Sequence, residues 1–116
     1  MAFRFENLAI WNDAVTFASS VYEILKVFPK TETFALADQL RRAVVSISAN
    51  IAEGSGSASQ RDFANYISIA LKSLHEVVSL LAVAHKNSYI DEASYKKLYS
   101  EAESLAKRIQ AFRNSL

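Results

Sequence analysis

The apolar positions of this chain recur at steps of three and four residues in four long stretches, which predicts four α-helices. The first stretch covers about residues 7–28 and stops before Pro29, because a helix interior does not tolerate proline. The core stripe predicted for this helix is Leu8, Trp11, Val15, Ala18, Tyr22, Leu25 and Phe28. Residues 1–6, which precede the helix, are expected to form an extended arm.

The second and third predicted helices are separated by a short loop rich in glycine and serine. The second runs from about residue 33 to 53, and Gly54 is expected to end it in a positive-φ conformation. Ser57 and Ser59 are both candidate N-caps for the third helix. The third helix has a regular stripe, with Leu71, Val78 and Val83 beyond it, so we expect it to contact more than one neighbour. The stripe consists of Phe63, Ile67, Ala70, Leu74, Val77, Leu81 and Ala84.

The fourth predicted helix begins after Asp91, a residue type that favours the N-cap position. Its apolar stripe consists of Leu98, Ala102, Leu105, Ile109, Phe112 and Leu116. Short loops between long helices favour antiparallel neighbours. The predicted fold is therefore all-α, an antiparallel up-down-up-down four-helix bundle in which residues 1–116 form a single domain.

Composition narrows the class of protein. A hydrophobic share of 51% is high for a 116-residue protein, which suggests that some apolar surface is buried against other subunits. The absence of cysteine excludes disulfides and thiolate chemistry, and it fits a cytoplasmic location. No secretory signal is visible, and the longest charge-free stretch, residues 43–52, is about half the ~20 residues of a membrane span. The net charge of +1 does not by itself indicate a nucleic-acid or membrane partner.

Motifs for catalysis, metals and cofactors are missing from the sequence. The Glu-x-x-His spacing of di-iron bundles does not occur, and the position four residues after His75 is Ser79 rather than a second histidine. There is no Walker loop, and no Ser-His-acid arrangement can be singled out. We therefore expect a protein that is not an enzyme and holds no metal or cofactor.

A polar seam runs along the second predicted helix, beside its apolar stripe of Leu36, Leu40, Ala43, Val44, Ile47 and Ile51. The seam also steps by three and four residues and consists of Gln39, Arg42, Ser46, Asn50 and Glu53. Three interpretations are open: a hydrogen-bond network that fixes helix register, a contact between subunits, or a ligand site. Buried polar residues fix register in coiled coils, so the first interpretation is favoured. Glu53 is expected to pair with Arg42 of a neighbouring helix or subunit, or with a main-chain amide of the next loop.

Basic residues are the other candidates for a binding role. Lys107, Arg108 and Arg113 follow the last acidic residue of the chain, where positive charge either interacts with the helix dipole or contacts phosphate. Arg41 points away from the predicted core stripe, and solvent exposure and phosphate contact are about equally expected for it.

Four motifs are distributed over the first half of the chain: Phe5-x-x-Leu8-x-x-Trp11, Phe28-Pro29-Lys30-x-Glu32-x-Phe34, Gln39-Leu40-Arg41-Arg42-Ala43 and Ser46-Ile47-x-x-Asn50-Ile51-Ala52-Glu53-Gly54. Together they resemble a known family, the four-helix-bundle proteins encoded in intervening sequences of bacterial 23S ribosomal RNA genes. The family also includes the accessory protein of diversity-generating retroelements, which binds nucleic acid and its reverse transcriptase. The resemblance implies a homopentamer with a basic surface or pore for RNA or DNA.

The resemblance implies roles for individual residues as well. Arg41, Arg42, Asn50 and Glu53 occupy signature positions, which indicate fold or assembly more than binding. Lys72 stands where the family commonly has glycine, and it adds a positive charge.

Two functions from different classes follow. In the first, a nucleic-acid-associated oligomer uses five basic residues on phosphates: Arg41, Lys72, Lys107, Arg108 and Arg113. In the second, the bundle is an assembly or scaffold module with a protein partner. The resemblance favours the first function modestly.

Overall fold

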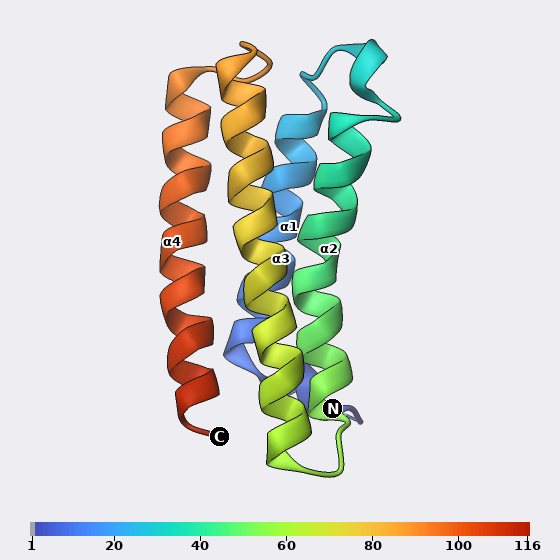
Figure 1. Cartoon of the computed structure of the whole chain (residues 1–116), viewed down its shortest axis with the longest axis vertical. Helices are drawn as coiled ribbons and strands as arrows, with labels where there is room; N and C mark the ends of the chain where they lie inside the picture. Colours follow the sequence, from blue (N-terminus) through green and yellow to red (C-terminus); the bar gives the residue numbers. More distant parts are fainter. Residues whose placement is uncertain (1) are drawn as a thin grey trace.

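Four long helices lie side by side in the computed structural model, which describes residues 2–116 (Figure 1). They are α1 (Ala9–Leu25), α2 (Leu36–Ser55), α3 (Gln60–Lys86) and α4 (Glu92–Asn114). A short 3-10 helix, η1 (Arg4–Asn7), precedes α1, and a second, η2 (Lys30–Glu32), lies between α1 and α2. Residues 2–116 contain no strand, so the all-α, four-helix prediction is confirmed. The α1–α2 and α3–α4 connections lie at one end of the bundle, and both chain ends lie at the other (Figure 1).

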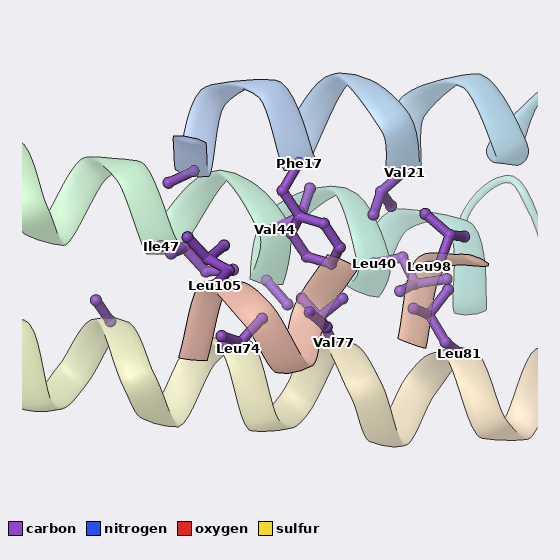
Figure 2. Packing of buried hydrophobic residues seen from close by; sticks show 14 of the residues in the cluster. Phe17, Val21, Leu40, Val44, Ile47, Leu74, Val77, Leu81, Leu98 and Leu105 are labelled. Atoms are coloured by element: carbon purple, nitrogen blue, oxygen red, sulfur yellow. The ribbon is translucent and has the colours of Figure 1, made fainter. Parts of the chain in front are cut away.

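The core runs along the bundle axis and receives side chains from all four helices (Figure 2). All seven stripe positions predicted for α3 are buried, and so are all six predicted for α2. On α4 the first four predicted positions are buried, whereas Phe112 and Leu116 are only partly covered. Regular apolar spacing therefore identified the core face of these three helices.

The core stripe predicted for the first helix is wrong except at Phe28, which is buried just beyond the end of α1. The residues of α1 that enter the core are Ile10, Ala14, Phe17 and Val21. Val15 and Tyr22 of the predicted stripe remain 38% and 45% exposed. Both sets step by three and four residues, and periodicity alone does not tell which of two apolar stripes on one helix faces the core.

Gly54 does not end α2 in the way the sequence predicted. No glycine among residues 2–116 has a positive φ, and α2 continues to Ser55 with Gly56 as its C-cap. Gly54 is buried, and a Cβ atom there would lie 2.6 Å from Tyr66 Cβ and 2.8 Å from Phe63 Cδ1. The absence of a side chain therefore allows α2 to approach α3 closely at this point.

The N-termini of α3 and α4 are capped by side chains. Ser59 Oγ accepts a hydrogen bond from Asp62 N at 3.1 Å, and Asp91 Oδ1 accepts one from Ser94 N at 2.8 Å. Hydrogen bonds from Ser94, first from its main chain and then from its hydroxyl, lower the pKa of the Asp91 carboxyl below its ordinary value. Asp91 is the N-cap that the sequence predicted.

The extended N-terminal arm predicted for residues 1–6 is wrong over residues 4–6, because these belong to η1 (Arg4–Asn7), and Met1 lies outside the described residues. Phe3 N donates to the Glu6 carboxylate at 3.1 Å, which closes this turn. The Phe5 ring packs 4.8 Å from Trp11, and the Arg4 guanidinium lies 5.0 Å above the Phe63 ring. Aromatic and cation–π contacts thus dock the segment on α1 and α3.

One helix, α3, has the length and apolar composition of a membrane span, although the sequence reading found no such segment. A helix that contributes to the core of a water-exposed helical bundle can have the same length and apolar composition. Seven residues of α3 are buried in the core, so its apolar composition is accounted for in part by packing within the bundle.

Candidate assembly and nucleic-acid surfaces

Two members of the polar seam form a hydrogen-bond network between α2 and α3. Ser46 Oγ lies 2.9 Å from Ser73 Oγ of α3. Asn50 Nδ2 donates to the Ser46 carbonyl at 2.8 Å and to Ser46 Oγ at 2.9 Å. The three side chains are partly buried and form hydrogen bonds with one another, which links the two helices at one register.

The other three seam residues are exposed to solvent. Arg42 Nε donates to Asp38 Oδ2 at 3.0 Å, so Arg42 pairs along its own helix rather than with Glu53. An open groove of about 520 Å³ lies over this part of α2 and α3, and Gln39, Arg42 and Glu76 line it. Its wall is mostly polar, and it contains no concentration of one charge.

Three of the five basic candidates take part in contacts within the fold. Arg41 Nη2 donates to the Thr33 carbonyl at 3.0 Å and holds the loop before α2. Arg108 pairs with Asp13, which ties α4 to α1. Arg113 Nε donates to Ser68 Oγ at 2.6 Å, which ties α4 to α3. These contacts give the three guanidinium groups a structural role in the bundle.

The other two basic candidates, Lys72 and Lys107, are exposed on α3 and α4. Neither forms an ion pair with any of residues 2–116. The five candidates are distributed over three helices, and they do not form one compact cationic site.

The two histidines, which could have indicated a metal or catalytic site, form local hydrogen bonds. His75 Nδ1 donates to the Leu71 carbonyl at 2.8 Å. His85 Nε2 lies 2.6 Å from Glu92 Oε2, and its ring stacks on Tyr95 at 4.4 Å. Within the described range, residues 2–116, no three His, Asp or Glu side chains are grouped as metal ligands.

A second apolar stripe runs along α1 beside the core, and two of its residues, Val15 and Tyr22, are exposed. We call it the α1 stripe, and it consists of Leu8, Trp11, Val15, Ala18, Tyr22 and Leu25. It contains no charged residue, and its positions lie beside rather than within the core. Further exposed apolar side chains include Val27 at 65% and Phe34 at 94%. The bundle therefore presents apolar surface that its own core does not cover.

Comparison with known proteins identifies the family. The model of the 23S rRNA-intervening sequence protein family matches residues 6–111. The chain belongs to the 23S rRNA-intervening sequence protein family. The resemblance that the sequence motifs indicated is thereby confirmed.

A solved structure supports the fold of this 23S rRNA-intervening sequence protein. It is the crystal structure of a protein of unknown function from the S23 ribosomal protein family of Bacteroides thetaiotaomicron. The two chains are 24% identical with a TM-score of 0.83, over 90% of this chain and 98% of the other. At this identity the similarity establishes the fold alone. Comparison with curated proteins gives no match.

Sequence reasoning on this 23S rRNA-intervening sequence protein missed two features of its surface. The first is Ser73, which completes the hydrogen-bond network of Ser46 and Asn50. Its position beside the apolar stripe of α3 is the one sequence feature that could have indicated this contact. Phe34 was expected at the start of the second helix. It lies in the loop before α2 instead, and no periodic pattern marks an exposed residue in a loop.

Proposed function

We propose that this 23S rRNA-intervening sequence protein is a non-enzymatic, cytoplasmic assembly protein. Antiparallel up-down-up-down bundles would associate with copies of themselves into a homopentamer. The observation that carries the proposal is the α1 stripe, an apolar row along α1 in which Val15 and Tyr22 are exposed and the other four positions are partly covered. Family membership and the high hydrophobic share of a small chain support it.

The energetics of apolar surface favour association. Burial contributes roughly 25 cal/mol per Å² of apolar surface, and a standard protein interface buries about 800 Å² on each partner. Contiguous apolar patches above a few hundred Å² are rare on soluble monomers. The α1 stripe, with Val15 and Tyr22 exposed, is a suitable centre for such an interface.

The decisive variant replaces Val15 and Tyr22 together by glutamate. We expect light scattering after size exclusion to give about 65 kDa for the wild type, five times the 12.9 kDa chain. The double variant should have the mass of one subunit with unchanged helicity, because charge at an apolar interface is strongly unfavourable. Glutamate at Ala93 and Ala111, which are exposed on α4, is the matched control and should keep the wild-type mass. A wild-type mass of one subunit would contradict the proposal.

A second candidate function is association of the oligomer with RNA. The exposed, unpaired Lys72 and Lys107 favour it, and a ring of subunits repeats each of them. Because Arg41, Arg108 and Arg113 already hold partners within the fold, binding is expected to be weak and tolerant of sequence. The affinity should fall with salt, because each phosphate contact releases counterions.

The RNA candidate is tested by glutamate substitutions at Lys72 and Lys107. We expect the double variant to lose affinity for a labelled structured RNA at low salt, while the oligomer mass stays unchanged. The control carries the same two substitutions at Lys26 and Lys96, which pair with Glu23 and Glu92. Equal affinity of wild type and both variants would exclude these lysines as contacts. No binding by the wild type would leave a protein partner, the scaffold alternative, as the role of the assembly.

A further inference from the structure

An open groove lies between α3 and α4, which run side by side (Figure 1). Its volume is about 370 Å³, within the range of roughly 300–1,000 Å³ that is typical of small-ligand sites. Half of its lining is apolar and half is polar. The apolar residues are Leu74, Val78, Ala102 and Ala106, and the polar residues are His75, Ser79, Tyr99 and Glu103. The α3–α4 groove therefore suits a flat ligand with apolar faces and polar edges.

Tyr99 presents an aromatic ring to this groove. Its ring centroid lies 6.2 Å from that of Tyr95, and the Tyr95 ring in turn stacks on His85 at 4.4 Å. Tyr99 nevertheless remains 47% exposed. An exposed aromatic ring beside a positively charged surface is the usual platform on which proteins stack the bases of single-stranded nucleic acid.

Two polar groups of the groove are hydrogen-bond acceptors. His75 Nδ1 donates to the Leu71 carbonyl at 2.8 Å, so Nε2 of the neutral ring is an acceptor. The Glu103 carboxylate also accepts, and it forms no ion pair with any of residues 2–116. Two acceptors favour a ligand edge that carries N–H donors. Cytosine has such an edge at its amino group, whereas uracil has a carbonyl oxygen at the same position.

Exposed lysines lie beside the groove on both helices. Lys72 precedes His75 by three residues on α3, and Lys107 follows Glu103 by four residues on α4. Each lysine is therefore about one helical turn from a lining residue. Lys86 follows His75 by eleven residues, close to three full turns, so it lies on the same line of α3, about 21 Å from Lys72. None of these lysines forms an ion pair within residues 2–116, so they are available to a polyanionic strand.

We infer that the α3–α4 groove holds an unpaired base of single-stranded RNA, stacked on Tyr99 with its amino edge towards His75 and Glu103. The inference rests on the RNA candidate of the proposed function and names the form of RNA that binds. The flanking lysines select a polyanion as the occupant. An apolar helix of a protein partner would instead desolvate the Glu103 carboxylate without offering it a donor, which is unfavourable. Only the docked base is selected, so the rest of the strand binds without regard to sequence.

Short single strands test the inference by fluorescence anisotropy at low salt. A labelled oligocytidylate of about 12 nucleotides should bind the wild type about fivefold more tightly than the matching oligouridylate, the effect of about one hydrogen bond. Tyr99→Ala should weaken binding of both about tenfold, because the stacking platform is lost. Glu103→Gln should reduce the preference for cytosine, because an amide offers a donor as well as an acceptor.

The matched control is Phe34→Ala. Phe34 is 94% exposed and lies between η2 and α2, in the loop that we call the Phe34 loop, outside the α3–α4 groove. This variant should bind both oligonucleotides as the wild type does. All three variants should keep the helicity and the mass of the wild type in circular dichroism and light scattering, because the substituted residues are exposed.

The outcomes separate the inference from the function on which it rests. Equal binding by wild type and Tyr99→Ala, or equal affinity of the wild type for the two oligonucleotides, would overturn the inference and leave the RNA candidate standing. A changed mass of Tyr99→Ala would identify the groove as a contact between subunits and would also overturn the inference. A wild type that binds neither these strands nor structured RNA would overturn both the inference and the RNA candidate.

Discussion

Phe63→Ala is expected to lower the free energy of unfolding by about 3–5 kcal/mol, the usual range for truncation of a buried phenylalanine. Phe63 is 1% exposed and joins several elements of the bundle. Its ring packs edge-on against Phe112 of α4 at 5.4 Å, and the Arg4 guanidinium covers it at 5.0 Å. The substitution therefore leaves a cavity where α2, α3, α4 and η1 meet.

Chemical denaturation at a fixed subunit concentration measures this loss, because the stability of an oligomer depends on concentration. Phe3→Ala is the matched control. Its ring is 64% exposed, and its removal should change stability by no more than about 0.5 kcal/mol. A loss below about 1 kcal/mol for Phe63→Ala would mean that the packing around this ring is looser than the structure shows.

Gly54→Ala is expected to destabilise the protein by about 1–3 kcal/mol, as overpacking of a core does. In an exposed helix the same change stabilises by about 1 kcal/mol, because alanine favours helix over glycine. Here the added methyl group would lie 2.6 Å from Tyr66 Cβ. No rotamer change moves a Cβ atom away, so α2 and α3 must separate and weaken the Ser46–Ser73 hydrogen bond.

Gly56→Ala is the internal control for this effect, because it makes the same chemical change two residues further along. The nearest atom to its added Cβ is the Glu53 carbonyl oxygen at 3.5 Å, and its φ of −89° suits any residue. Its melting temperature should match the wild type. If Gly54→Ala raised the melting temperature instead, the close approach of α2 and α3 would be absent in solution.

How well the sequence predicted each helix depended on how many apolar faces that helix has. On α3, strict spacing of large apolar residues singled out one stripe, and all of it is buried. On α1, two apolar stripes compete, and the one with Trp11 and Tyr22 contains the larger rings. The core instead took the side with Ala14 and Phe17, where small and large residues fit between neighbouring helices. Such steric selection depends on the partner helices, which periodicity does not describe.

The prediction of a cationic site from the sequence was limited in a similar way. The positive charges near the C-terminus appeared free because no acidic residue follows them in the sequence. Arg108 nevertheless reaches Asp13, 95 positions away along the chain. Arg113 reaches Ser68, 45 positions away. Contacts over such separations arise from the arrangement of helices, so local charge patterns overestimated how many of these groups are available to a ligand.

Both ends of the described chain lie at the end of the bundle opposite the Phe34 loop (Figure 1). A label or affinity tag fused to either terminus therefore leaves that loop unobstructed. The α2–α3 loop lies at the same end as the termini. Joining the termini by a flexible linker and opening the chain in this loop would keep all four helices whole. The new chain ends would then lie beside Gly54, where a reporter could follow the separation of α2 and α3 directly.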